Sequence, residues 1–314
     1  MTTPIDTPIA NPLHALSDAL ADVVDSIGRA TVAVRGPGRH GGASGVVWRP
    51  GVLVTAAHVF RRAPAAIAVV GADGVSVGAA LIGLDSATDV AVFRLPTADI
   101  AAAPLAGAAG LRTGELAIAV GRSQRGELTS SFGMVNRVAG AWQTWLGGHV
   151  DQLIRLDGGI HDGLSGGPVA NAAGRVIGIA TSALSRGYGV VVPEATVSRV
   201  VDDLLAKGHV ARAFLGIGAQ PVPLPVAAGS DAEETGTGLL ITSLVPGGPA
   251  AQAGVLIGDI VLAVDGHPAT SLHEMRRLLA GQIGQSVPIS LLRGGVPAEL
   301  PLTVAQWPTE NRRC

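Results

Sequence analysis

One serine stands among glycines in a setting that suits acyl-transfer chemistry. Ser165 lies in the stretch Asp162-Gly163-Leu164-Ser165-Gly166-Gly167-Pro168. Glycines permit a sharp, crowded turn, and such a turn can hold a hydroxyl at the surface beside free backbone N–H groups. An exposed nucleophile next to donors for an oxyanion is what acyl transfer requires. An ordinary glycine-rich loop would explain the same residues, because short motifs give false positives.

Two further residues could activate this hydroxyl. A serine is a weak nucleophile until a base, itself oriented by an acid, takes its proton. His58 ends an apolar strand in Thr55-Ala56-Ala57-His58, where small residues let another segment approach closely. Asp89 precedes the apolar run Val90-Ala91-Val92-Phe93, so its charge needs a partner. Each alone could be an ordinary loop residue, but together they predict a triad. Asp85 is the competing carboxylate.

Strand-forming runs surround these residues. Short apolar or β-branched runs, each bounded by Gly, Asp or Pro, recur at the spacing of an all-β barrel or sandwich. Apolar residues at helical spacing predict one helix before these runs, over 13–27, and one after them, over 195–207. An Ala-rich connector, 98–110, divides the runs into two sets. The first set is Thr31–Val34, Ser44–Trp48, Val52–Thr55, Ile67–Val70, Val75–Ile82 and Val90–Leu95, and the second is Leu116–Val120, Leu128–Val138, Gln152–Leu156, Gly167–Val169, Val176–Thr181 and Gly189–Val192.

A further unit runs from residue 214 to about 304. Ser271 and Glu274 have the spacing of a capping box, which predicts a helix to about residue 280. Strands are predicted on either side of it, over Gly238–Leu244, Ser286–Leu292 and Ala298–Val304. This unit is separate from the one before it, whose last helix is closed by Gly208.

Composition limits the classes of protein. With 314 residues, 47% hydrophobic and 15% charged, the chain can bury the cores of two or three domains. A net charge of −2 gives no reason to expect nucleic-acid binding. The only cysteine is Cys314, which excludes an intramolecular disulfide and a cysteine-rich zinc site. No His-x-x-x-His pattern or acidic ligand cluster supports a metal-dependent hydrolase, so we expect no metal and no cofactor.

The first residues carry no sign of export. Residues 1–11 lack a basic start and an apolar run, and no segment approaches the roughly 18 apolar residues of a membrane helix. The sequence as it stands predicts no membrane span and a location that is cytoplasmic or unknown, and a trimmed or mis-set start would look the same.

The three motifs together resemble those of trypsin-like serine peptidases, whose chain order is also His, Asp, Ser. With the C-terminal unit, the chain resembles the HtrA/Deg branch over about residues 30–304. The resemblance implies a mainly β fold: two six-stranded antiparallel β-barrels of the chymotrypsin type, followed by an α+β PDZ domain. The boundaries expected are an N-terminal arm with an amphipathic helix at 1–29, a protease domain at 30–208 (barrels about 30–105 and 111–193, terminal helix 195–207), a PDZ domain at 213–306 and a tail at 307–314.

The resemblance also implies roles for residues at the motif positions. Ser165 is the nucleophile, His58 the general base and acid, and Asp89 the group that fixes the His58 tautomer. The backbone N–H groups of Gly163 and Ser165, helped by that of Leu164, form the oxyanion hole. Leu164 stands where the family usually has asparagine, but only its backbone is used.

Substrate selection is expected to favour small or medium apolar side chains at P1. Gly159 stands where enzymes that cut after Arg or Lys carry the pocket-floor aspartate. The segment toward Leu184 is small and aliphatic. The residues assigned to the substrate pocket are Gly159, Ile160, Thr181, Ser182, Ala183 and Leu184.

The PDZ resemblance implies a second binding site. The loop from Phe214 to Ile217 would hold a peptide carboxylate on its N–H groups, and the peptide would add as a strand beside the following segment. A PDZ fold that serves only as a spacer is the alternative. The residues assigned to this site are Phe214, Leu215, Gly216, Ile217, Met275, Leu278 and Leu279.

The function expected is a serine endopeptidase of protein quality control, which cleaves unfolded or damaged polypeptides and binds peptide C-termini at the PDZ domain. A catalytically silent, chaperone-like protein of the same fold is the alternative. Trimeric family members pack through aromatic residues in the N-terminal arm, and this chain has none before Trp48, which leaves a homo-oligomer open. An arginine that relays PDZ occupancy in some members has no match over 147–152, although Arg155 is near. Family members are usually exported to the periplasm.

Overall fold

The computed structural model describes residues 11–36, 42–60, 62–185, 187–224, 236–279 and 281–307. The outermost parts of the expected arm and tail, 1–10 and 308–314, lie outside these ranges. Contacts divide the chain into two compact units, Met1–Val210 and Ala211–Cys314.

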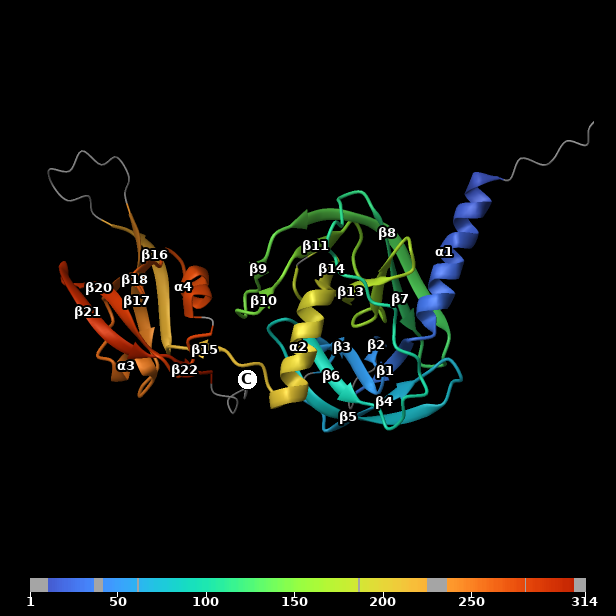
Figure 1. Ribbon diagram of the computed structural model, residues 1–314, viewed down its shortest axis with the longest axis horizontal. Coiled ribbons are helices and arrows are strands. Elements are labelled where there is room, and N and C mark those ends of the chain that lie inside the picture. The colour runs from blue at the N-terminus through green and yellow to red at the C-terminus, as the bar shows by residue number, and fades with distance from the viewer. Residues whose placement is uncertain are drawn as a thin grey trace, which may run out of the picture. The chain divides into compact units, whose positions relative to one another are not determined.

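Six antiparallel strands of the first unit close into a barrel (Figure 1). The spatial order is β1-β2-β3-β6-β5-β4, and pairing of β1 with β4 completes the circle. The central strands are buried along almost their whole length, since residues on both faces meet other parts of the unit. The strands are β1 (Thr31–Arg35), β2 (Ala43–Arg49), β3 (Val52–Ala56), β4 (Ala66–Val70), β5 (Ser76–Asp85) and β6 (Val90–Arg94).

A second closed barrel follows in the same unit, in the order β11-β14-β13-β12-β7-β8. Between β8 and β11 lies a small hairpin of β9 (Trp142–Gln143) and β10 (His149–Val150). The strands of the barrel are β7 (Leu116–Arg122), β8 (Leu128–Ala139), β11 (Leu153–Leu156), β12 (Pro168–Asn171), β13 (Val176–Thr181) and β14 (Val190–Pro193).

The two barrels share one hydrophobic core cluster. It joins residues of the first barrel, such as Val92, to residues of the second, such as Ile118, and to Val200 of helix α2. Helix α2 (Glu194–Lys207) contacts strands of both barrels and ends at Gly208, whose φ of 73° gives the left-handed cap expected from the sequence. Burial of this cluster therefore fixes one barrel against the other.

A buried arginine fastens the N-terminal helix α1 (Pro12–Gly28) to the barrels. Arg122 is 4% exposed, and its guanidinium donates to the backbone carbonyls of Gly28, Thr31 and Gly126. Burial lowers the pKa of Arg122 from its usual value. The three carbonyls replace the water that the guanidinium loses.

The second unit has its own sheet and core. The sheet order is β16-β17-β18-β20-β21, with β19 paired to β18, and helix α4 contacts β16 and β18. Strand β16 is an edge strand. The elements are β15 (Ala213–Phe214), β16 (Ile217–Pro223), β17 (Thr237–Leu244), α3 (Pro249–Gln252), β18 (Ile260–Val264), β19 (His267–Pro268), α4 (Leu272–Leu279), β20 (Ser286–Arg293), β21 (Val296–Thr303) and β22 (Ala305–Gln306).

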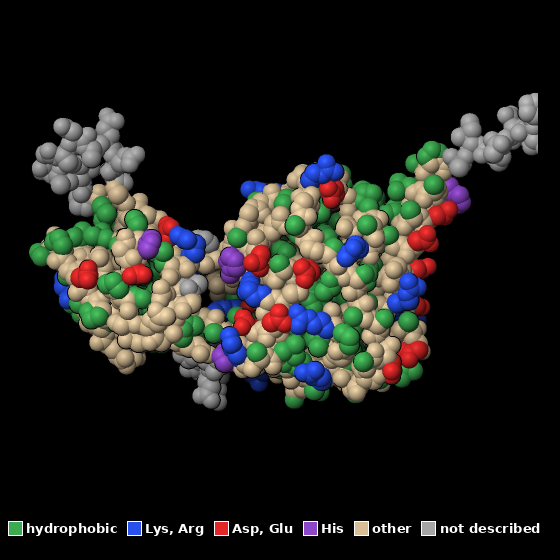
Figure 2. All heavy atoms as spheres, viewed as in Figure 1, with side chains coloured by type: hydrophobic (Ala, Val, Ile, Leu, Met, Phe, Trp, Pro, Cys, Tyr) green, Lys and Arg blue, Asp and Glu red, His purple; other side chains and the backbone are tan. Residues whose placement is uncertain are grey.

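This architecture confirms the fold class expected from the sequence: mainly β, with two closed six-stranded antiparallel barrels. Among the described residues, no helix is long and apolar enough to cross a bilayer. On the face drawn in Figure 2, basic and acidic side chains are interspersed.

Candidate active site

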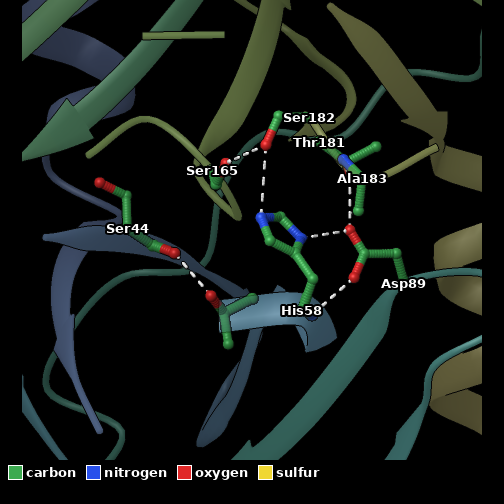
Figure 3. A network of polar contacts seen from close by, with 8 residues as sticks. Ser44, His58, Asp89, Ser165, Thr181, Ser182 and Ala183 are labelled. Atoms are coloured by element: carbon green, nitrogen blue, oxygen red, sulfur yellow. Dashed lines mark hydrogen bonds and ion pairs between the residues drawn. The ribbon is translucent and has the colours of Figure 1, made fainter. Parts of the chain in front are cut away.

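The first barrel supplies a histidine–aspartate pair. After β3, the chain turns into a short 3-10 helix, η1 (Ala57–Val59), which carries His58. Asp89 directly precedes β6. Because β3 and β6 are paired, their ends bring these two residues together. His58 Nδ1 lies 2.7 Å from Asp89 Oδ2, and the His58 N–H donates to Oδ1 over 2.7 Å (Figure 3). Asp89 therefore fixes both the ring and the backbone of His58.

Asp89 is held in place by its own turn. Its φ is 62°, in the left-handed region that non-glycine residues seldom adopt, and it is 2% exposed. The competing carboxylate, Asp85, does not reach His58: it accepts the hydroxyl of Thr88 over 2.7 Å and two N–H groups of the same turn. Asp85 shapes the turn that presents Asp89. The carbonyl of Ala87 in this turn accepts the hydroxyl of Thr144, over 2.6 Å.

The second barrel supplies the serine. Ser165 lies in the loop before β12, and its Oγ is 3.4 Å from Ser182 Oγ. Ser182 Oγ is in turn 3.4 Å from His58 Nε2 (Figure 3). The structure thus brings the three expected triad residues to one place, with a second hydroxyl, that of Ser182, among them.

The glycines after the serine let the loop settle between the barrels. Gly166 has a φ of 82°, and a Cβ on it would lie 2.4 Å from the carbonyl oxygen of Ser44. A Cβ on Gly167 would lie 2.3 Å from the carbonyl oxygen of Val120. Real Cβ atoms do not approach backbone so closely, so both positions require glycine for packing, and Gly166 requires it for its backbone conformation as well.

Ser44 of β2 clamps this loop from the other barrel. Its N–H donates to the Ser165 carbonyl over 3.0 Å, and its hydroxyl donates to the Gly163 carbonyl over 2.6 Å. The same hydroxyl accepts the Arg122 N–H over 2.9 Å. Ser44 is fully buried, and sequence reasoning missed it. A hydroxyl inside an otherwise apolar buried strand was the available signal, because it needs a partner.

The backbone N–H groups expected to bind an oxyanion differ in their hydrogen bonding. Within the described part of the chain, no acceptor takes the N–H of Gly163 or of Ser165. The N–H of Leu164 donates instead to the His161 carbonyl over 3.1 Å, in a tight turn. Leu164 is therefore removed from the expected oxyanion donors, because its N–H is already used, while its side chain is buried against the second barrel.

The residues expected to form the substrate pocket lie in different surroundings. Ile160 is close to Gly189, because a Cβ atom built on Gly189 would lie 2.9 Å from Ile160 Cδ1. Gly159 has open space where a Cβ would be. Leu184 packs against the core cluster that the barrels share, whereas Ile160 packs against the cluster of the second barrel.

Thr181 is a correction, because its side chain is fully buried and donates its hydroxyl to Asp89 Oδ2 rather than facing a substrate. It also accepts the Ala183 N–H over 3.0 Å. Thr181 ends β13 with its side chain turned inward, a direction that a short apolar run alone does not reveal.

The second unit places the expected peptide-binding loop beside the edge strand β16. Gly216 has a φ of 72°, and the carbonyls of Leu215 and Gly216 accept the N–H groups of Ala250 and Val245. No acceptor among the described residues takes the N–H groups of Leu215 and Gly216 themselves. The loop thus turns its carbonyls inward and keeps donors available, as a carboxylate site requires.

The side chains of α4 lie deeper than expected. Met275 and Leu279 are each 2% exposed and belong to the core, and Leu278 is half-buried. Met275 lines a small apolar cavity together with Leu215 and Ile217, which lie at and after the loop. Leu279 belongs to the same core but is not part of that lining. Phe214 stacks edge-on against Trp307.

Comparisons with known proteins agree with these two units. Residues 43–179 match the family model for a trypsin-like peptidase domain, and residues 240–293 match that for a PDZ domain. A probable periplasmic serine endoprotease, DegP-like, of Chlamydia trachomatis is 33% identical over 285 residues, which are 89% of this chain and 55% of that one. A DegP-like endoprotease of Brucella suis is 32% identical over 282 residues, 86% of this chain and 53% of that one. The chain thus spans about half the length of these relatives.

Solved structures give the same picture. The HtrA-type protease AlgW with a decapeptide matches with a TM-score of 0.76 and 25% identity, over 92% of this chain and 99% of that one. The serine endoprotease from Yersinia pestis matches with a TM-score of 0.73 and 26% identity, over 92% of this chain and 98% of that one.

Fold, site and family models together define a chain in which a trypsin-like peptidase domain is followed by a PDZ domain. More narrowly, the chain is a homologue of the DegP-like serine endoproteases and a structural neighbour of the HtrA-type proteases, which confirms the HtrA/Deg resemblance of its three motifs.

Proposed function

We propose that the chain is a serine endopeptidase that uses Ser165, His58 and Asp89. The observation that carries the proposal is the pairing of His58 Nδ1 with a buried Asp89 beside the Ser165 hydroxyl. Asp89 keeps the proton on Nδ1, so that Nε2 has a lone pair to receive the serine proton. A neutral imidazole oriented in this way is a general base for acyl transfer.

The reaction follows from this arrangement. Ser165 Oγ attacks the scissile carbonyl as its proton passes to His58, and the N–H groups of Gly163 and Ser165 stabilise the oxyanion. The imidazolium then gives its proton to the leaving amine, and the acyl-enzyme is hydrolysed by water with His58 as base. Thr181 supports Asp89 as an anion, because its hydroxyl donates to the same carboxylate oxygen that accepts His58.

The test uses the wild-type chain and Ser165→Ala. Wild type should cleave casein and bind a fluorophosphonate probe covalently, whereas Ser165→Ala should do neither while melting at a similar temperature. A wild type that neither cleaves nor reacts, with or without added C-terminal peptides, would leave the catalytically silent, chaperone-like protein as the better description.

The substrates proposed are unfolded or damaged polypeptides, cut after small or medium apolar residues. Gly159 and Ile160 support this preference, since neither carries a charge that would hold Arg or Lys at P1. A peptide library should show apolar P1 residues, and a profile dominated by Arg or Lys would contradict the proposal.

The PDZ unit is proposed to bind peptide C-termini at the loop before β16. The free N–H groups of Leu215 and Gly216, the edge position of β16 and the adjacent apolar cavity support this role. A fluorescent peptide with a free carboxylate should bind, and its C-terminal amide should bind at least about tenfold more weakly. Equal affinities would contradict a carboxylate site and favour a spacer.

The location proposed is outside the cytoplasm. The relatives named periplasmic support it over the cytoplasmic location expected from the sequence. Fractionation of the source cells, followed by immunodetection of the protein, tests it: recovery with the cytoplasmic markers would contradict the proposal.

A further inference from the structure

An arginine and a tyrosine that the proposed mechanism leaves unused form a stacked pair beside the expected substrate pocket. The guanidinium carbon of Arg155, on β11, lies 3.6 Å from the centroid of the ring of Tyr188, two residues before β14. A cation over an aromatic face is attracted by the partial negative charge of that face. Arg155 Nε is buried, and it has no hydrogen-bond partner among the residues that the structure describes. The ring therefore takes the place of water on one side of the guanidinium.

The chain at Tyr188 benefits from such a contact because it stands between two glycines. Gly187 has a φ of 91°, and glycine moves between backbone conformations at little cost. Of the residues 187–189, only Tyr188 has a side chain that can anchor the segment. Its side chain is 46% exposed, so burial alone does not fix it. The contact with Arg155 thus restrains a segment that its glycines leave free to move.

The same segment borders the expected substrate pocket. Gly189 donates its N–H to the Gly158 carbonyl over 2.9 Å, and its own carbonyl accepts the Leu156 N–H over 2.9 Å. A Cβ on Gly189 would lie 2.9 Å from Ile160 Cδ1. A movement of Tyr188 would therefore displace the backbone beside Ile160, where the P1 side chain is proposed to bind.

We propose that Arg155 is a positioning residue that holds Tyr188 in place and thereby limits the size of the P1 side chain that the pocket accepts. The inference rests on the proposed peptidase function. With the ring held by the guanidinium, the backbone at Gly189 stays against Ile160, which suits valine better than phenylalanine at P1. Without this contact the backbone can retreat, so that a large P1 side chain gains space and a medium one loses contacts.

The experiment uses the full chain and two peptide substrates that are identical except for valine or phenylalanine at P1. The measured quantity is the ratio of their kcat/KM values, valine over phenylalanine. We expect Tyr188→Leu, which keeps an apolar side chain but has no aromatic face, to lower this ratio about threefold to tenfold, a change within the range of one cation–π contact. Arg155→Gln should lower it by a similar factor. Tyr188→Phe, which keeps the ring face, should behave like wild type.

Further measurements separate this role from a general loss of structure. Arg137→Gln changes an exposed arginine opposite Arg155 on β8, and it should leave the ratio unchanged. Labelling of Ser165 by diisopropyl fluorophosphate, which carries no P1 side chain, should keep the wild-type rate in every variant, and melting temperatures show that each variant folds. In the double variant Arg155→Gln, Tyr188→Leu, the ratio should fall no further than in either single variant, because all three lose one and the same contact.

Several outcomes would overturn the proposal. They are an unchanged ratio in Tyr188→Leu, an equal loss in Tyr188→Phe, an equal fall of kcat/KM for both peptides, and a double variant in which the two effects add. A wild type that neither cleaves nor labels would instead contradict the proposed function, so the two failures are distinguishable.

Discussion

At the scale of single residues, the position of Asp89 is stabilised by its hydrogen bonds against an unfavourable backbone conformation. A non-glycine residue at a φ of 62° is strained. The carboxylate accepts hydrogen bonds from the His58 backbone, the His58 ring and Thr181, which hold it there. The strain therefore lies where the imidazole is oriented, and changes at Asp89 should affect rate more than fold.

Asp89→Asn tests this orientation. The amide can donate to His58 Nδ1, which would leave the proton on Nε2 and remove the base, so kcat should fall about 10⁴-fold. Casein or peptide cleavage measures the loss. Asp99→Asn, on the exposed segment after the first barrel, is the control and should cleave like wild type. A loss of less than about tenfold in Asp89→Asn would argue against the assigned role.

Ser44→Ala tests the clamp on the nucleophile loop. The change leaves the Gly163 carbonyl and the Arg122 N–H without their buried partner, which should cost about 1–3 kcal/mol of unfolding free energy. Because the Gly163 N–H is one of the two proposed oxyanion donors, kcat should also fall. Urea unfolding and peptide kinetics measure the two effects. Ser76→Ala, at the exposed start of β5, should change neither, and full activity in Ser44→Ala would show that the loop keeps its geometry without the clamp.

The sequence could single out the three candidate triad residues because each of them stands beside a strong local pattern. His58 and Asp89 lie at the ends of apolar strands, and Ser165 lies among glycines. Ser44 and the inward direction of Thr181 could not be predicted in the same way, because their partners lie 119 and 92 residues away. Only the closed barrels bring such segments into contact.

At the scale of elements, one loop supports the turn that presents Asp89. The segment between β9 and β10 places Thr144 and Gly148 against Ala87, two residues before Asp89. Thr144 donates its hydroxyl to the Ala87 carbonyl and accepts the Gly148 N–H over 3.0 Å. The β9–β10 hairpin, which connects two strands of the second barrel, thereby contacts the first barrel beside the candidate active site.

Gly148→Ala tests this contact. A Cβ at this position would lie 2.3 Å from the Ala87 carbonyl oxygen, so the loop must move away from the turn. We expect kcat to fall at least about tenfold, because small displacements of catalytic groups are costly, with little change in peptide binding by the PDZ unit. Gly140→Ala, in the same connection, meets no atom within 4 Å and should behave like wild type. Equal activities would show that the turn holds Asp89 without the loop.

The strands of both barrels follow their apolar runs, and their bounds differ from the sequence prediction by a few residues. The elements that could not be predicted are short ones, such as β9, β10 and η1. Two or three residues carry no periodicity, and these elements exist because neighbouring strands hold them. His58 lies on η1, so the sequence did not show the turn that carries this histidine.

At the scale of the whole molecule, the described residues form three core clusters in the first unit and one in the second, so each unit has a hydrophobic core of its own. We therefore expect two transitions on heating. In the second unit, hydrogen bonds from the Arg293 guanidinium, over 2.9 and 2.8 Å, hold the pKa of Asp259 below its usual 3.8, against the burial that raises it.

The pH dependence of the second unit follows from this pair. Because Asp259 loses its proton more readily in the folded state, its stabilisation is complete above pH 3.8 and is lost as pH falls through the lower, folded value. Asp259→Asn should cost about 1–3 kcal/mol at pH 7. It should shift one of two calorimetric transitions and flatten the acid dependence of that transition alone. A shift of both transitions would contradict independent units.

The shared core and the Ser44 clamp mean that the candidate active site of the first unit forms only when both barrels are present and packed together. One barrel carries His58 and Asp89, the other carries Ser165, and the carbonyls of Gly163 and Ser165 are fastened by a residue of the opposite barrel. A chain severed in the connector between β6 and β7 would give two halves that are each inert toward a fluorophosphonate. If each half were fused to one of two interacting proteins, binding of those proteins would bring the halves together. Fluorophosphonate labelling of Ser165 would then report that the two proteins interact.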